Sequence, residues 1–343
     1  MKILLTGASG AVGTATLAQL MVRDRHTVTV FDLKTKQAKR AFKPYGKGLR
    51  VIFGDISHKE ELAGACKDQD VVIHLAAIIP PLADDEPELA ARVNTLGTQN
   101  LLACLQEHSP KAFVIYGSSI AVYGDRLQNP YIKAGDPLTP SLGDEYAKTK
   151  IAAERLVRES GLDYAIFRIT AVFGANNHKI SKLIFHMPLA TPIEFITPED
   201  AGRAFAKAVE HVAALKGQVF NLSGGRECRV IYRDFLRQSF LNSGLGEPGF
   251  PENSFATKNF HCAYYADGDA LEAILRFRQQ TTADLYRMQA AAIPWYIKFL
   301  TRLFRKPIRK ALLGKSEPRR AIKEHDSAHI RRFFGAEWPG KAN

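Results

Sequence analysis

Cysteine is scarce in this sequence, and long apolar runs are absent. The 343 residues include only 4 cysteines, and their spacing matches no metal-binding motif, so no metal centre is predicted. No uninterrupted apolar run approaches the roughly 20 residues of a membrane-spanning helix. The first predicted strand begins at residue 2, which leaves no room for a secretory leader. These absences predict a cytoplasmic protein with reduced cysteines.

Acidic residues are scarce near the carboxyl terminus. Residues 293–332 contain twelve lysines and arginines against Glu317, Glu324 and Asp326, a balance of +9 out of a net +12 for the whole chain. The remainder is close to neutral, which argues against a nucleic-acid-binding face on the main fold. An apolar fraction of 46% and a charged fraction of 24% are typical of a soluble globular protein.

Glycine, by contrast, forms a pattern at the amino terminus. The apolar run Ile3–Leu5 is typical of a buried parallel strand, and glycines follow at 7, 10 and 13, before a helix-like segment at 14–22. The N–H groups of such a turn converge on an anion, and the helix dipole favours a phosphate. Gly7 is expected to allow the tight turn, Gly10 the approach of a pyrophosphate, and Gly13 the packing of helix on strand. The alternative is an ordinary glycine turn in an α/β domain.

A second predicted strand, at residues 26–31, is followed directly by Asp32, 19 residues after Gly13. A carboxylate at this distance accepts hydrogen bonds from an adenosine ribose and repels a 2′-phosphate, which predicts NAD in preference to NADP. Four basic residues follow and keep NADP open, namely Lys34, Lys36, Lys39 and Arg40. The alternative for Asp32 is a solvated strand end.

Two further strands end in candidate cofactor residues. The third ends at Asp55, whose carboxylate is expected either to contact the adenine or to cap the following helix. The fourth, residues 71–77, ends in Ala76 and Ala77, whose small side chains leave room for a cofactor against the backbone. His74 lies in the apolar run of this strand and is interpreted as a core residue in preference to a catalyst.

Hydroxyl groups and a lysine follow the fifth predicted strand. Ser118 and Ser119 lie at its carboxyl end, where parallel sheets bind ligands. After a proline-rich loop, Tyr146 and Lys150 stand four residues apart at the start of a helix that runs to Ser160, so they share one helical face.

Taken in order, these features resemble the extended short-chain dehydrogenase/reductase family, in its NAD-dependent epimerase/dehydratase branch. The resemblance covers about residues 1–290 and rests on collinear motifs at Thr6–Gly13, Asp55–Ile56, His74–Ala77, Asn94–Gly97, Ser118–Gly124, Tyr146–Lys150, Arg168–Gly174, Glu194–Asp200, Phe220–Gly225 and Tyr264–Asp267. It implies a Rossmann-type α/β fold with a doubly wound parallel sheet. The residues that it assigns to an NAD cofactor are Gly7, Ser9, Gly10, Ala11, Val12, Gly13, Asp32, Asp55, Ile56, Leu75, Ala76, Ala77, Asn94, Tyr146 and Lys150.

The resemblance also implies catalytic roles. Tyr146 would be the general acid/base, Lys150 would bind the nicotinamide ribose, and Ser119, with Ser118 as its substitute, would hold the substrate oxygen. A free tyrosine titrates at about 10, so it is a poor base at neutral pH. A neighbouring ammonium and the positive nicotinamide ring favour the phenolate and move its pKa towards neutrality.

A three-part organisation follows. We expect an NAD-binding domain at 1–173, to which 194–223 return. Residues 174–193 and 224–290 are expected to form a smaller substrate-binding lobe, and residues 291–343 a basic helical tail.

The substrate is less determined than the cofactor. Family members that use nucleotide sugars often carry Arg-Asp-Phe where this chain has Ile193–Phe195, and that arginine holds substrate phosphate. Its absence argues against a nucleotide sugar, although Arg226, Arg229 and Lys258 are candidate replacements. We predict an NAD-dependent oxidoreductase acting on a secondary alcohol, ketone or sugar carbinol. The alternatives are a nucleotide-sugar epimerase with transient hydride transfer and a non-catalytic dinucleotide-sensing protein.

Two more expectations come from the resemblance. A dehydratase usually needs an acidic residue just after the serine, where this chain has Ile120 and Ala121, so dehydration is disfavoured. Relatives often dimerise through helices that correspond to 85–107 and 146–160, which predicts a homodimer.

The basic tail departs from the family. Residues 294–313 have helical spacing, with Pro307 as an expected kink. Apolar residues lie on one face, namely Tyr296, Leu300, Leu303, Phe304 and Ile308. Basic residues lie on the other, namely Lys298, Arg302, Arg305, Lys306 and Arg309. Such a helix covers its own domain, lies on an anionic membrane, or binds a partner. Membrane contact would favour a lipid-linked or sterol-like substrate.

Overall fold

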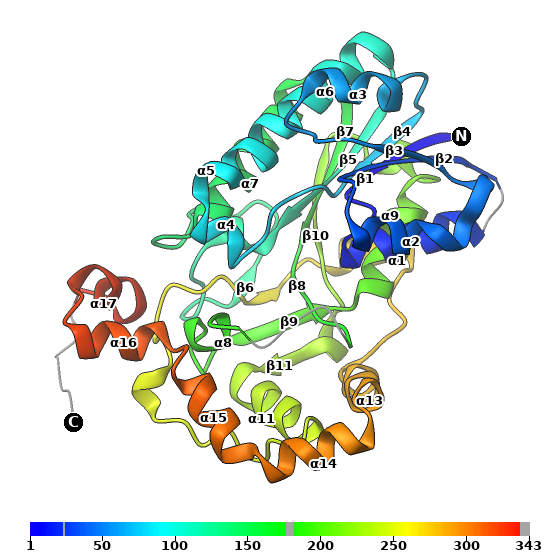
Figure 1. Ribbon diagram of the computed structural model, residues 1–343. Helices are drawn as coiled ribbons and strands as arrows, with labels where there is room; N and C mark the ends of the chain where they lie inside the picture. Colours follow the sequence, from blue (N-terminus) through cyan, green and yellow to red (C-terminus); the bar gives the residue numbers. More distant parts are fainter. Residues whose placement is uncertain (23–24, 176–180, 337–343) are drawn as a thin grey trace.

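The computed structural model describes residues 1–22, 25–175 and 181–336. Seven strands of this part form a parallel sheet in the order β10-β7-β5-β4-β1-β2-β3 (Figure 1). The strands are β1 (Lys2–Thr6), β2 (Thr27–Asp32), β3 (Arg50–Phe53), β4 (Val71–His74), β5 (Phe113–Ser119), β7 (Asp163–Ile169) and β10 (Gln218–Leu222). The strand order reverses between β1 and β4, and ligands bind at the carboxyl ends of strands beside such a reversal.

The sheet is buried on both faces, as an all-parallel sheet requires. In β1, Ile3 and Leu5 enter one core cluster and Leu4 enters the other, because successive side chains of a strand point to opposite faces. Helices α1 (Ala11–Val22) and α9 (Pro198–Ala208) pack on the first cluster. The second cluster is covered by α3 (Lys59–Cys66), α6 (Gly97–His108) and α7 (Glu145–Glu159).

Helices α1 and α9 approach each other unusually closely. A Cβ atom on Gly202 of α9 would lie 2.5 Å from the carbonyl carbon of Ala15 in α1, so only glycine fits there. Strand β9 (Pro192–Ile196) leads directly into α9, which the hydroxyl of Thr197 caps. Helix α9 ends at Ala208, before the separate α10 (Val212–Leu215).

Shorter elements connect the strands. They are α2 (Lys36–Phe42), α4 (Leu82–Asp85), α5 (Pro87–Ala90), a π-helical turn (Ala91–Leu96), and 3₁₀ turns at Lys43–Gly48 and Ile120–Tyr123.

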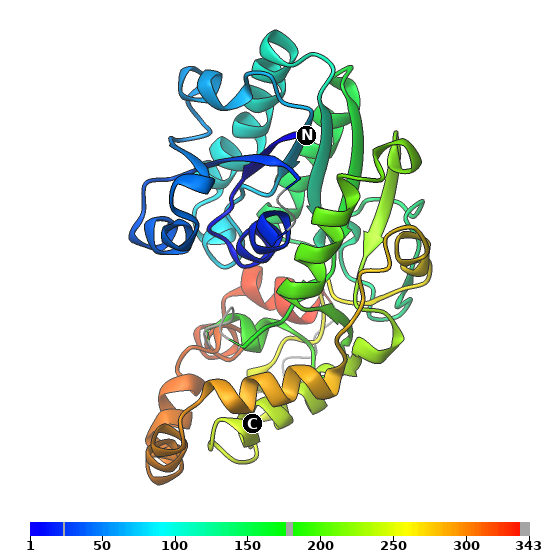
Figure 2. The same cartoon turned by 90° about the vertical axis from the view of Figure 1, so that its right-hand side faces the viewer.

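A second group of elements lies at the carboxyl ends of the central strands (Figures 1 and 2). Its strands are β8 (Ala171–Val172), β9 (Pro192–Ile196) and β11 (Arg229–Ile231), beside the two-stranded pair β6 (Tyr131–Ile132) and β12 (Tyr264–Tyr265). Its helices are α8 (Leu183–His186) and α11 (Tyr232–Asn242), with 3₁₀ turns at Arg226–Cys228 and Glu252–Ser254. A phenylalanine-rich cluster fills its core. Helix α12 (Asp269–Leu275) returns to the main sheet and packs in the same core cluster as α1 and α9. The domain limits given above stay a prediction.

The tail is helical, as expected, but it bends earlier. Helix α13 (Thr282–Ala292) leads into it from the second group of elements. The helices of the tail are α14 (Trp295–Leu303), α15 (Arg305–Leu313), α16 (Glu317–Glu324) and α17 (Ser327–Phe334). The break falls at Phe304, three residues before the predicted kink at Pro307, which lies in the first turn of α15. A proline ring clashes with the carbonyl four residues earlier, here that of Leu303, so the preceding helix must end there.

The predicted fold class, a Rossmann-type parallel α/β sheet with a helical carboxyl-terminal region, is confirmed. Within the described ranges, no helix is both long and apolar enough to cross a bilayer.

Candidate functional site

The glycine loop joins β1 to α1 at the strand-order reversal. Gly7 has φ +69°, and a Cβ atom there would lie 2.6 Å from the backbone nitrogen of Ala76. A Cβ atom on Gly13 would lie 2.1 Å from the carbonyl oxygen of Gly7. Gly10 is different, because its added Cβ would approach only the Gly7 oxygen, at 3.3 Å. Gly7 and Gly13 therefore allow the tight turn, because neither position has room for a side chain. Gly10 leaves open the side of the loop where a phosphate would approach.

Asp32 braces this loop from the end of β2. Its Oδ2 accepts a hydrogen bond from the N–H of Ser9 at 2.7 Å, and its Oδ1 accepts one from the N–H of Leu33 at 2.8 Å. Each oxygen keeps a second lone pair for a further donor. The carboxylate is thus held beside the loop, and its contact with a ribose stays a prediction.

We expect Asp32→Ala to weaken NAD binding by about tenfold, because a charge-assisted hydrogen bond contributes about 1.5–3 kcal/mol. Discrimination against NADP should fall as well, since the repelling charge is removed. Isothermal titration with each nucleotide measures both effects. Asp70→Ala is the matched control, because Asp70 also accepts a backbone N–H, that of Lys2 at 2.7 Å, at the opposite end of the sheet. Equal losses in the two variants would contradict a cofactor role for Asp32.

The segment after β4 lies between the glycine loop and α6. The N–H of Ala76 donates to the Thr6 hydroxyl at 3.3 Å. Asn94, in the π-helical turn, accepts from the N–H of Ile78 at 2.7 Å and donates to its carbonyl at 2.9 Å and to Thr149 of α7 at 3.0 Å. Asn94 therefore fixes the backbone beyond Ala76 and Ala77 against the helix that carries Tyr146. Its predicted contact with the cofactor stays a prediction.

Asp55 and Ile56 are engaged locally. The Asp55 carboxylate accepts from both the N–H and the hydroxyl of Ser57, at 2.9 and 2.8 Å. These bonds form a turn before α3, whose N-cap residue is His58 and which has no side-chain cap, so the helix-capping role given above as the alternative is wrong. The side chain of Ile56 packs in the core under Gly97. Adenine contact by these two residues stays a prediction.

Ser119, Tyr146 and Lys150 come together at the carboxyl end of β5. The Ser119 side chain lies near that of Tyr146 and lowers the pKa of its hydroxyl. The Lys150 Nζ lies 5.8 Å from the centroid of the Tyr146 ring and 4.8 Å from that of Tyr116, and it donates to the carbonyl of Gly117 at 2.8 Å. The three side chains thus share one contact region, although they come from a strand end and a helix 27 to 31 residues later.

Burial opposes ionisation in this cluster. It raises the pKa of Tyr146, and the Ser119 side chain lowers that pKa only in part. Burial also lowers the pKa of Lys150 to about 7, against the opposing charge of Glu154. In the protein alone, Tyr146 is therefore a neutral hydrogen-bond donor, and a further positive charge beside it would favour its phenolate.

Ser118 points elsewhere. Its hydroxyl donates to Glu154 Oε1 at 2.6 Å, and Glu154 forms a two-pronged ion pair with Arg168 at 2.8 and 2.7 Å. Both charged side chains are 2% exposed. Adjacent residues of a strand face opposite ways, so only one of the two serines can face Tyr146. The structure directs Ser118 into the buried ion pair, and the substitute role given to it above is replaced by a structural one.

His74 is a core residue, as the sequence indicated. It is 1% exposed and lies between the hydroxyls of Thr6 at 2.7 Å and Thr98 at 2.9 Å. The Thr98 hydroxyl donates to the carbonyl of Asn94, so it can only accept from His74. His74 Nε2 therefore carries the ring proton, and Nδ1 accepts a hydrogen bond from the Thr6 hydroxyl. Burial, together with the charge of Lys150, lowers the pKa of His74 to about 3 and keeps it neutral.

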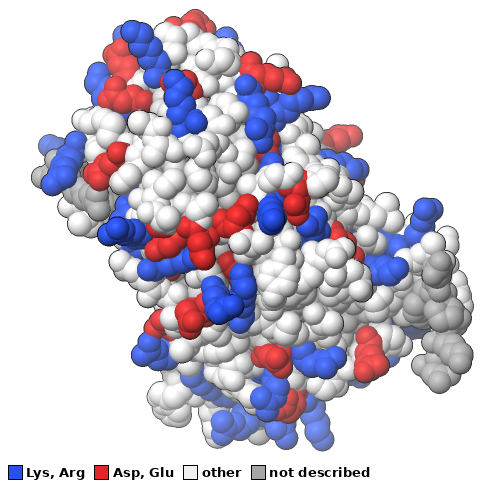
Figure 3. Space-filling model, turned by 180° about the vertical axis from the view of Figure 1, so that it is seen from behind, with Lys and Arg blue, Asp and Glu red and all other residues white. Residues whose placement is uncertain are grey.

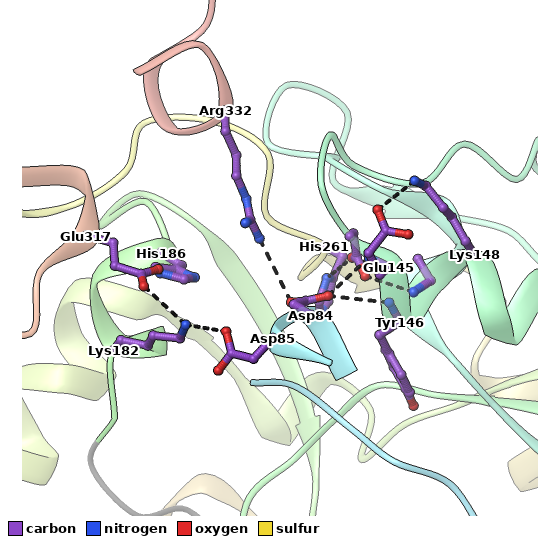
Figure 4. Close-up of polar contacts among 12 residues, drawn as sticks. Asp84, Asp85, Glu145, Tyr146, Lys148, Lys182, His186, His261, Glu317 and Arg332 are labelled. Carbon is purple, nitrogen blue, oxygen red and sulfur yellow. Dashed lines mark hydrogen bonds and ion pairs between the residues drawn. The ribbon is translucent and has the colours of Figure 1, made fainter. Parts of the chain in front are cut away.

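Two aspartates that the sequence analysis did not single out hold the amino end of α7. Asp84 Oδ1 accepts from the N–H groups of Glu145 and Tyr146 at 3.1 and 3.4 Å, and Asp144 caps the helix at Ala147 N (Figure 4). Carboxylates are stabilising at this positive end of the helix dipole. Their effect here is to fix the turn from which the Tyr146 side chain projects.

The tail reaches this same place. Arg332 of α17 lies 3.9 Å from Asp84, and His261 lies 2.7 Å from Asp144. Nearby, Lys182 bridges Asp85 of α4 to Glu317 of α16, at 2.5 and 3.1 Å (Figure 4). The last two helices therefore fold back towards the amino end of α7, and the tail beyond α15 is part of the surroundings of the site.

The substrate side carries a buried apolar residue, Ile193, where nucleotide-sugar enzymes often carry arginine. The next residue, Glu194, stands where those enzymes often carry aspartate. Glu194 is 1% exposed and pairs with Arg229 at 2.7 Å, and Arg229 also donates to the carbonyl of Tyr265 at 2.9 Å. Arg229 is thus engaged by groups of the protein and is a poor replacement for a phosphate-binding arginine. Arg226 is exposed, on the 3₁₀ turn that precedes β11.

A family model described as the NAD dependent epimerase/dehydratase family matches residues 3–223. The chain belongs to this family. Among characterised relatives of the family, it is 32% identical to the dTDP-glucose 4,6-dehydratase of Mycolicibacterium smegmatis over 186 residues, which are 52% of this chain and 54% of that protein. It is 28% identical to the 3-beta-hydroxysteroid dehydrogenase of Mycolicibacterium neoaurum over 207 residues, 57% of this chain and 54% of that one. The chain thus spans about half the length of these relatives.

Solved structures of family enzymes share the fold. The dTDP-glucose 4,6-dehydratase DesIV of Streptomyces venezuelae, with NAD bound, aligns with a TM-score of 0.69 and 23% identity, over 85% of this chain and 96% of that chain. The UDP-glucuronic acid 4-epimerase of Bacillus cereus, with NAD and UDP-glucuronic acid, aligns with a TM-score of 0.68 and 22% identity, over 88% and 100%. The family membership predicted from the motifs is confirmed, and the roles of individual site residues stay predictions.

Proposed function

We propose that this protein is an NAD-dependent oxidoreductase that acts on a secondary alcohol or ketone. The observation that carries the proposal is the contact of Ser119, Tyr146 and Lys150 at the carboxyl end of β5, beside the glycine loop at the end of β1. Dinucleotide binding alone needs only the loop. A protein that merely sensed the dinucleotide would have no use for a buried Tyr-Lys pair with a serine against it.

The residues present fit an NAD cofactor. The open side of Gly10 and the amino end of α1 suit the pyrophosphate, and the Asp32 carboxylate suits the adenosine ribose. When bound, NAD would supply hydride acceptance and return. Lys150 would hold the second ribose, Ser119 would hold the substrate oxygen, and Tyr146 would exchange the proton at that oxygen.

We propose a substrate without a nucleotide diphosphate. The buried Ile193 supports this, because an apolar side chain stands at the position that often carries a phosphate-binding arginine. The nearby Arg229 is already paired with Glu194. The relative named 3-beta-hydroxysteroid dehydrogenase is one family member named for such an alcohol. Buried Ile120 and Ala121 after Ser119 offer no acid for dehydration.

A nucleotide-sugar epimerase is the second candidate. It is favoured by the 33% identity, over 50% of this chain, to the UDP-glucose 4-epimerase of Vibrio cholerae. An epimerase returns the hydride to the same sugar and so keeps its cofactor, whereas a dehydrogenase must exchange it.

Cofactor retention separates the two candidates. We expect purified protein to release NAD on dilution, and to form NADH when NAD is added with some members of a panel of secondary alcohols that includes sterols and free sugars. Nucleotide analysis of the heat-denatured protein, followed by NADH absorbance, measures this. Stoichiometric NAD that resists dilution, with conversion of UDP-glucose, would support the epimerase instead. Failure to bind NAD would contradict both.

We also propose a cytoplasmic homodimer. The pairing through the helices of residues 85–107 and 146–160 rests on the family resemblance alone.

A further inference from the structure

Helix α14 turns its apolar face away from the protein. Trp295, Phe299 and Leu303, spaced four residues apart, are 79%, 59% and 65% exposed. Tyr296 and Leu300, one residue further round the helix, are 51% and 46% exposed. No residue of α14 is buried. Isolated exposed apolar residues are ordinary, but a continuous stripe of large ones marks an interaction surface.

The other side of α14 faces the protein. Lys298 donates to the carbonyl of Ala290 at 2.6 Å, and its backbone oxygen would lie 2.6 Å from a Cβ atom on Gly244, at the end of α11. A helix that covers its own domain would place its apolar side there. For α14 that interpretation is wrong, whereas α15 does follow it, with Leu312 in the core of the second group of elements.

The charge around the stripe has a single sign. From residue 285 to residue 316 the chain contains no Asp or Glu and eight lysines and arginines. Four of the basic side chains are exposed on or beside the stripe, namely Arg302, Arg305, Lys306 and Lys310. The helix lies at the lower edge of the molecule, opposite the central sheet (Figure 1). Basic side chains predominate along that edge, with a few acidic ones among them (Figure 3).

We propose that α14 is a docking surface for an anionic lipid bilayer. The helix lies flat, with Trp295, Phe299 and Leu303 in the boundary between headgroups and acyl chains and the basic residues on the lipid phosphates. A second copy of this chain fits the surface poorly. It would bring two segments of strongly positive charge together, and cores of protein interfaces are depleted of charge.

Tryptophan fluorescence tests the proposal in the full chain. The chain has 2 tryptophans, so Trp338→Phe leaves Trp295 as the single reporter. We expect its emission to shift to shorter wavelength with phosphatidylglycerol vesicles and to stay unchanged with phosphatidylcholine vesicles. The protein should float with the former in a density gradient, and high salt should release it. No shift with either vesicle, or equal binding to both, would overturn the proposal.

Matched variants locate the contact. We expect Phe299→Ser/Leu303→Ser to weaken vesicle binding by at least about tenfold, because both side chains lose their apolar burial. Val22→Ser, at an 81% exposed apolar residue on α1, should have no effect. Unchanged thermal unfolding and NAD binding would show that each variant is folded. If the double variant binds vesicles like the parent, or if its only effect is to abolish self-association measured by ultracentrifugation, the membrane assignment is wrong.

Discussion

Tyr146→Phe is expected to lower turnover by about 10³-fold while NAD affinity stays within about twofold, since positioned proton transfer contributes about 10²–10⁴-fold. The substitution removes one hydroxyl, whose pKa Ser119 lowers, and leaves the ring beside Lys150 in place. A secondary alcohol that the parent protein oxidises provides the assay, with NADH formation for turnover and calorimetric titration for NAD binding.

The matched control is Tyr45→Phe, which removes a tyrosine hydroxyl at the edge of the core under α1. It should leave both measurements unchanged. Undiminished turnover in Tyr146→Phe would exclude the acid/base role. A parallel loss of NAD binding and turnover would instead assign Tyr146 to cofactor binding alone.

Arg168→Met is expected to destabilise the protein by about 3–5 kcal/mol, because it leaves the buried carboxylate of Glu154 without its partner. Burial on its own would lower the pKa of Arg168, yet the hydrogen bonds and charge of Glu154 raise it. Arg168 also donates to the Tyr123 hydroxyl and the Ala134 carbonyl, each at 2.8 Å. The change therefore disturbs the junction of β7 with the loop before α7. Chemical denaturation measures the loss.

An exposed ion pair supplies the comparison. Lys216 and Asp163 lie 2.8 Å apart at the starts of neighbouring strands, with side chains 61% and 49% exposed. Lys216→Met should cost no more than about 1 kcal/mol, as solvent screens such pairs. If Arg168→Met and Lys216→Met lower the free energy of unfolding by similar amounts, the buried Glu154–Arg168 pair does not stabilise the fold as its geometry indicates. A double variant, Glu154→Leu/Arg168→Met, should recover much of the loss.

Short-range patterns were enough to predict the cofactor side of the site. Glycine at positive φ, an acid at the next strand end and a Tyr-Lys pair one helical turn apart are all set by spacing along the chain. The choice between Ser118 and Ser119 was only partly open to sequence reasoning. The period of two in a strand allows only one of them to face Tyr146. Because β5 is apolar and buried on both faces, its sequence does not say which one.

Contacts between segments far apart in the chain could not be predicted from sequence patterns. Asp84 and Arg332 are 248 residues apart, and nothing in the sequence near either indicates the other. The orientation of α14 was equally hidden. An amphipathic pattern gives the two faces of a helix but does not say which one meets the protein, and here the apolar face meets solvent. The sequence did predict a bend caused by Pro307. The bend lies three residues earlier than predicted, because the proline ring clashes with the backbone of the preceding helical turn.

The close contact between α1 and Gly202 of α9 has a consequence for synthesis. The glycine loop and α1 are made first, but the helix that packs on them follows about 190 residues later. At about 5–20 residues per second, a ribosome needs roughly 10–40 s to cover that distance. During this interval the apolar side of α1 is without its partner, and the strand that completes the sheet, β10, follows later still. The dinucleotide-binding half of this chain is therefore a late product of translation, although its signature motif emerges first.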